Sequence, residues 1–146
     1  MKNCIVLISM LTVPLLCAPV FTTEGVVSET NAYRLRASVP RLTVNKILMK
    51  AAQKKAEDMA ERGYFQHDTP EGRTPWDAIA DDGYIFSAAA ENIATGHNSP
   101  ADVLKAWMGS PGHRRNILDR RFKEIGVGIA RVKVGYVVVQ LFGSRN

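Results

Sequence analysis

Three side chains in this chain of 146 residues have the types that metal binding and proton transfer use: His67, Glu91 and His113. Two imidazoles and one carboxylate suit a divalent metal such as Zn²⁺ with open coordination positions. The same groups equally suit general acid–base catalysis. The alternative is that three separate polar residues each fix a loop. Spacing along the chain leaves this choice open, because sites assemble from distant segments.

Ser110 adds a further interpretation of the same region. Together with His113 and Glu91 it supplies the residue types of a Ser-His-acid hydrolase, either protease-like or directed at the cell envelope. However, Ser110 lacks a nucleophile elbow, and it is separated from His113 only by a Pro-Gly turn. A binding module is therefore favoured over an enzyme.

The elements that must position these residues can be predicted from capping and periodicity. His113 follows Ser110-Pro111-Gly112, which should end an amphipathic helix that starts at Ser99-Pro100 and carries Trp107. His67 closes the segment 64–67, which alternates like an extended strand. Glu91 lies in a run of small residues, 88–96, where a carboxylate can approach the backbone closely. His97 is expected to lie exposed in a polar loop.

Apolar spacing predicts a long helix over 45–62, ended by Gly63, and shorter helices over 27–37 and from Thr74 onward. In the first helix, Ser28 or Thr30 is the expected cap. The residues expected on its buried side are Val27, Ala32, Tyr33 and Leu35. Alternating residues 125–130 and the run 136–142 predict an antiparallel hairpin, and helices followed by a hairpin indicate an α+β fold.

Charge limits the class of partner. The chain carries 19 Lys and Arg against 14 Asp and Glu, a net charge of +5. Its basic pairs, at 114–115 and 120–121, have no interleaved aromatic residues, and Asp119 separates them. We therefore expect a solvated basic face and no nucleic-acid partner.

The N-terminus indicates export. Lys2 precedes a mostly apolar run over 5–20 that is too short for a membrane span, so residues 1–22 are predicted to be a secretory signal peptide. Lipidation at Cys17 is the weaker alternative, because the bulky Leu16 precedes it, and an uncleaved anchor ranks third. Cys4 and Cys17 both lie in this segment, so the exported domain has no disulfide. We expect it to be secreted, extracellular or periplasmic, and monomeric, with no transmembrane span.

Four blocks in order resemble a bacterial member of the CAP superfamily (cysteine-rich secretory, antigen 5 and pathogenesis-related proteins), also called the SCP domain. The matching blocks are Tyr64–His67, Ala90–Ala94, Trp107–Leu118 and Ile125–Ala130, and Asn31 also fits. The similarity covers residues 27–143, almost the whole exported chain.

The resemblance implies an α-β-α sandwich with a small central antiparallel sheet and a surface cleft. In the family, two His and two Glu line that cleft and can hold a divalent ion. Here His67, Glu91 and His113 match three of them, and Ser110 occupies the place of the second Glu. The resemblance thus implies a reduced cleft, a possible metal set of His67, His113 and Glu91, and a partner that is an envelope component, a lipid or a protein.

Overall fold

The computed structural model describes residues 21–145, so the predicted signal peptide, including Cys4 and Cys17, falls almost wholly outside the described residues. Five helices and four strands follow one another within that range. In chain order they are α1 (Thr23–Arg36), β1 (Thr43–Val44), α2 (Lys46–Arg62), α3 (Pro75–Asp81), β2 (Ala88–His97), α4 (Pro100–Gly109), α5 (Pro111–Leu118), β3 (Glu124–Arg131) and β4 (Tyr136–Ser144).

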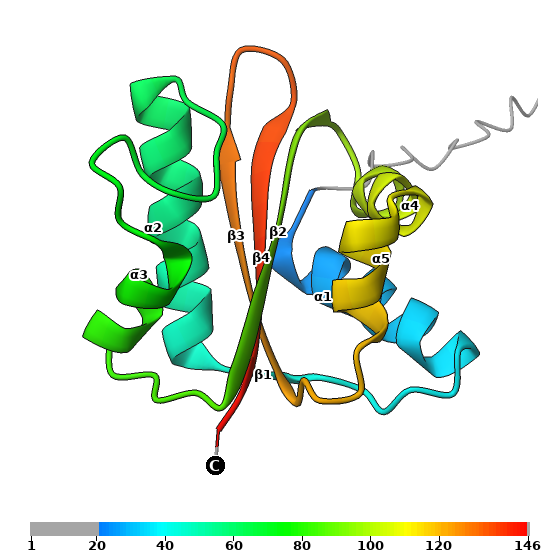
Figure 1. Cartoon of the computed structure of the whole chain (residues 1–146). Coiled ribbons are helices and arrows are strands. Elements are labelled where there is room, and N and C mark those ends of the chain that lie inside the picture. The colour runs from blue at the N-terminus through cyan, green and yellow to red at the C-terminus, as the bar shows by residue number, and fades with distance from the viewer. Residues whose placement is uncertain (1–20, 146) are drawn as a thin grey trace, which may run out of the picture.

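The elements form three layers (Figure 1), with α2 and α3 on one side of the sheet and α1, α4 and α5 on the other. This confirms the predicted α+β fold. The strand order is β1-β3-β4-β2, which places the hairpin strands β3 and β4 in the centre. The sheet is mixed and not purely antiparallel, because the short β1 runs parallel to β3. No helix among residues 21–145 has the length and apolar character needed to cross a bilayer.

Helix α2 lies directly on β3. The side chain of Asn45 caps its first turn, and Gly63 ends the helix as predicted, in the left-handed conformation. Its buried face contains three alanines, which allow close approach. A Cβ added at Gly126 or Gly128 would lie only 2.1 Å from the backbone of α2. The glycines of β3 are therefore what allows the helix to reach the sheet.

The opposite layer is anchored by Trp107 of α4. Its ring is almost fully buried with Val103 and Leu104, which confirms the predicted apolar face of this helix. The indole Nε1 donates a hydrogen bond to the carbonyl oxygen of Ile93 in β2 at 3.1 Å. Trp107 thus joins α4 to the strand that carries Glu91.

The start and phase of the first helix were predicted incorrectly. The helix begins at Thr23 with Thr22 as its cap, and its buried residues are Val26, Thr30 and Arg34. Leu35, expected to be buried, is 60 % exposed. The error arises because a polar and a charged side chain occupy the inner face, which a hydrophobic pattern does not reveal.

Arg34 is buried because backbone oxygens satisfy its guanidinium. It donates to the carbonyls of Pro40, Ile117, Asp119 and Phe122 at 2.7, 2.8, 2.9 and 3.2 Å, respectively. Charged groups are tolerated in a protein interior only when they are paired in this way. The side chain ties the end of α1 to the segment that links α5 with β3.

Local predictions around the site had mixed outcomes. The caps at Thr74 and Ser99, each followed by proline, are confirmed, and so is the hairpin. Residues 64–67 are not a strand but part of an irregular loop. The small residues 88–96, for which no element was predicted, belong to strand β2. His97 was expected to lie exposed in a polar loop, but it ends this strand and is half-buried.

Candidate cleft between the histidines

His67 is held in place by α2. After Gly63 reverses the chain, the loop 64–74 returns along the helix, and Lys55 of α2 reaches it. The Nζ of Lys55 donates to the carbonyl oxygen of His67 at 2.7 Å and contacts the hydroxyl of Tyr64 at 3.3 Å. The backbone at His67 is therefore fixed, while its side chain remains 56 % exposed.

Glu91 is held by the edge strand β2 and is buried. It pairs with Leu141 of β4, and only 2 % of its side chain is exposed. The Nδ1 of His67 donates to Oε1 of Glu91 at 2.7 Å. The structure thus joins two of the three predicted site residues directly, although they lie 24 positions apart.

His113 sits in the first turn of α5. The chain is extended at Ser110, Pro111 starts the helix, and the buried Ile117 anchors it. The side chain of Asn92 in β2 donates to the carbonyl oxygen of His113 at 3.3 Å. His113 is half-buried, and its ring lies against that of Trp107 with 6.4 Å between the centroids.

A chain of amides, two of them buried, supports this arrangement, and sequence reasoning did not identify it. Asn116 of α5 donates to Asn92 at 2.9 Å, Asn92 to Gln140 of β4 at 3.1 Å, and Gln140 to Thr30 of α1 at 2.7 Å. Asn116 also donates to the carbonyl of Glu91. The only signal in the sequence is that Asn92 and Gln140 interrupt otherwise apolar strands.

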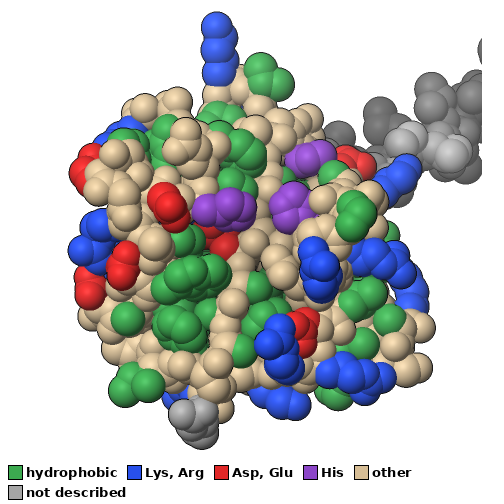
Figure 2. Space-filling view, viewed as in Figure 1, with side chains coloured by type: hydrophobic (Ala, Val, Ile, Leu, Met, Phe, Trp, Pro, Cys, Tyr) green, Lys and Arg blue, Asp and Glu red, His purple; other side chains and the backbone are tan. Residues whose placement is uncertain are grey.

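A cleft of about 350 Å³ opens beside the His67–Glu91 pair. Figure 2 shows histidine side chains on this face of the molecule, next to a group of hydrophobic side chains. Trp76 of α3 contributes an aromatic wall that was not predicted as part of the site. The lining residues are His67, Asp68, Pro75, Trp76, Ala89, Ala90, Glu91 and Asn116. His113 and Ser110 lie outside this lining.

The electrostatics distinguish the two histidines. The hydrogen bond to Glu91 raises the pKa of His67, and burial raises the pKa of Glu91 despite the neighbouring imidazole. Burial lowers the pKa of His113, and the positive charge of His67 lowers it further. The His67–Glu91 pair therefore retains a proton to higher pH, whereas His113 stays neutral and can accept a proton or ligate a metal.

The hydroxyl of Ser110 makes no capping bond to α5, and within residues 21–145 it makes no hydrogen bond to His113. The carboxylate of Glu91 bonds His67 and not His113. A Ser-His-acid relay needs both contacts, so the described contacts do not assemble one.

Within the part of the chain that the structure describes, no three His, Cys, Asp or Glu side chains converge as a metal site. Metal binding by His67, Glu91 and His113 stays a prediction, and it requires these side chains to move. The two imidazoles fit the role of metal ligands better than the carboxylate of Glu91 does. Glu91 already occupies Nδ1 of His67, which is the usual role of a carboxylate that orients a ligating histidine and leaves Nε2 for the metal.

Known proteins share both the sequence pattern and the fold. Residues 27–142 match the pattern of the CAP family, described as the cysteine-rich secretory protein family. The chain is 41 % identical over 119 residues to the uncharacterized protein YkwD of Bacillus subtilis (strain 168), and the match covers 82 % of this chain and 46 % of YkwD.

Two solved structures are similar to this one. An extracellular protein containing an SCP domain from Bacillus anthracis str. Ames superposes with a TM-score of 0.76 at 31 % identity, over 85 % of this chain and 40 % of that one. An outer surface protein from Borrelia burgdorferi gives a TM-score of 0.78 at 25 % identity, over 84 % of this chain and 92 % of that one. The chain thus spans less than half of the length of YkwD and of the Bacillus anthracis protein.

Proposed function

Since the chain belongs to the CAP family, the cysteine-rich secretory protein family, we propose that it is an exported binding module that takes its ligand in the cleft beside His67 and Glu91. Two similar proteins are described as extracellular and as an outer surface protein, which supports the same location for this chain. The proposed partner is a component of the cell envelope, a lipid or a protein, bound by a monomer.

The observation that carries this proposal is the hydrogen bond between His67 and a carboxylate that is 2 % exposed. Burying Glu91 costs stability unless its charge is compensated. The imidazole that compensates it stays 56 % exposed at the cleft. This pair is therefore built to present a fixed, chargeable imidazole to whatever enters the cleft.

A divalent metal such as Zn²⁺ is the first ligand to test. His67 would ligate through Nε2 while Glu91 holds Nδ1, and His113 would supply the second imidazole. Once bound, the ion would provide a Lewis acid at the surface of the cleft. The chain's own residues would orient it through the Asn92–Asn116 amides that hold α5 against β2.

Calorimetric titration of Zn²⁺ into the exported protein tests the cleft. We expect His67→Ala and His113→Ala to abolish binding, whereas His97→Ala, at the end of β2, leaves it unchanged. Glu91→Gln should weaken the affinity about 10–100-fold, the usual effect of losing a partner that orients a ligand. Equal affinity in all variants would place the metal elsewhere, and an absence of binding by the parent protein would refute a metal role for the cleft.

Export is tested separately by the mass of the protein recovered from the medium or envelope fraction. Cleavage between about residues 18 and 25 is expected from the short apolar run. A mass that includes Met1, or a lipid on Cys17, would contradict this prediction.

A further inference from the structure

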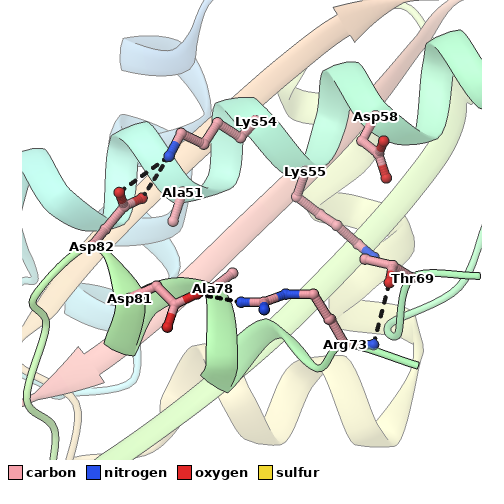
Figure 3. A pocket seen from close by; sticks show the side chains of 9 residues that line it. All are labelled: Ala51, Lys54, Lys55, Asp58, Thr69, Arg73, Ala78, Asp81 and Asp82. Atoms are coloured by element: carbon pink, nitrogen blue, oxygen red, sulfur yellow. Dashed lines mark hydrogen bonds and ion pairs between the residues drawn. The ribbon is translucent and has the colours of Figure 1, made fainter. Parts of the chain in front are cut away.

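A second pocket, referred to below as the rear pocket, lies between α2 and α3 and shares no lining residue with the cleft. It is enclosed by α2, α3 and the loop 64–74 and has a volume of about 360 Å³. Figure 3 shows side chains of α2 and α3 that face each other across it. The pocket is separate from the cleft described above, because the two have different lining residues.

The pocket continues inward to Glu91. A deeper void of about 50 Å³ shares five lining residues with it, among them Ala51, Lys55 and Ala78, and ends at Glu91 and Leu141. The Oε1 of Glu91 bonds His67, but its buried Oε2 has no hydrogen-bond partner among residues 21–145. An unpaired buried acceptor is costly, so this oxygen requires a donor in the void.

The groups around the void select the kind of donor. Lys55 carries three N–H donors, of which two already contact His67 and Tyr64, and Arg73 lies on the same wall. An ammonium group would satisfy Glu91 but would be repelled by both cations. A carboxylate would be repelled by Glu91. A hydroxyl fits, because it donates to Oε2 and can accept from Lys55 at the same time.

The mouth of the pocket favours a neutral ligand. Three cations and three carboxylates line it, so their formal charges cancel. Lys54 pairs with Asp82 at 3.1 Å and Arg73 pairs with Asp81, as Figure 3 shows. These groups offer donors and acceptors for additional hydroxyls, while Ala78 provides part of the apolar wall.

We propose that this rear pocket binds a small neutral polyol, with one hydroxyl donating to Oε2 of Glu91. The proposal does not depend on a metal or a ligand in the cleft, because Oε1 is the oxygen that bonds His67 and Oε2 is the oxygen without a partner. A polyol in the rear pocket and a ligand in the cleft would nevertheless share one carboxylate. The size of the outer pocket is typical of sites for small ligands.

Titration of xylitol into the ¹⁵N-labelled exported protein, followed by amide chemical shifts, tests the proposal without metal. Saturable shifts should be centred on Ala51, Lys55 and Ala78, with a Kd on the order of 1–10 mM for a ligand of this size. Ala78→Leu fills the shared wall from an exposed position of α3, which a helix tolerates. It should weaken binding at least tenfold.

Ala80→Leu is the matched control, since it changes another exposed alanine of α3 outside the lining of both spaces, and it should bind xylitol like the parent. Shifts that do not saturate, or equal affinity in the parent protein and Ala78→Leu, would overturn the site. Tighter binding of n-butylammonium or acetate than of xylitol at the same amides would overturn the assignment to a neutral polyol.

Discussion

Replacing Trp107 tests whether α4 is fixed to β2 as described. The ring is 2 % exposed, and its Nε1 donates to the carbonyl of Ile93 at 3.1 Å. Trp107→Ala removes the largest buried side chain and leaves a cavity, which costs about 3–5 kcal/mol. Trp107→Phe keeps most of the ring but leaves the carbonyl oxygen unpaired, so we expect a loss of about 1–3 kcal/mol. The difference between the two variants separates packing from hydrogen bonding.

Equilibrium unfolding in urea measures both losses, provided that the slope of the transition stays constant. Small domains have about 5–15 kcal/mol of stability, so the Trp107→Ala variant should still fold, with a lower free energy of unfolding that the assay can measure. Trp76→Phe is the control, because this half-buried ring lines the cleft and makes no hydrogen bond to another described residue. A loss below about 1 kcal/mol for Trp107→Ala would refute the packing described for α4.

Three further predictions address Arg34, the pair in the cleft and the helix–sheet contact. Arg34→Met should lower the free energy of unfolding by about 2–6 kcal/mol in urea, because two fully buried carbonyls lose their donor at about 1–3 kcal/mol each; a loss under about 1 kcal/mol would mean that the guanidinium is dispensable. NMR titration should give His67 a pKa above its ordinary value of about 6.5, and Glu91→Gln should lower it. Since the pKa of His67 is raised in the folded state, the stability that the pair contributes is complete below about pH 6.5 and is lost as the pH rises through the folded pKa. The difference in the free energy of unfolding between the parent protein and Glu91→Gln should therefore decrease over this pH range. A difference that stays constant with pH would contradict the ion pair. Gly128→Ala places a carbon 2.1 Å from a carbonyl oxygen of α2 and should cost about 1–3 kcal/mol or more, whereas Gly109→Ala meets open space and should cost nothing in the same thermal or urea unfolding assay.

Local signals predicted those elements whose ends are fixed by neighbouring residues. Thr74 and Ser99 each cap a helix through their own side chains, so a few neighbouring positions suffice to find the start. The apolar face of α2 is likewise a local pattern. Elements stabilised by distant partners were missed. Strand β2 begins with three alanines, which have little preference for strands, and it forms because β4 pairs with it.

The candidate site shows the same division. Residue types identified His67, Glu91 and His113, and the resemblance to the family grouped them. The contact between His67 and Glu91 depends on the loop 64–74 lying back along α2, which no short pattern encodes. The unpaired Oε2 and the pocket behind it depend on α2, α3 and β2 together.

The order of the strands has a consequence for how the protein folds as it is made. The two central strands, β3 and β4, are the last elements of the domain to leave the ribosome, and both edge strands precede them. Until β3 emerges, the apolar face of α2 has no strand to cover it, and until β4 emerges, β2 has no partner. Chains are made at about 5–20 residues per second, so a nascent chain of this domain spends seconds without its core. The sheet, and with it the core on both of its faces, can be completed only when the hairpin supplies the two central strands.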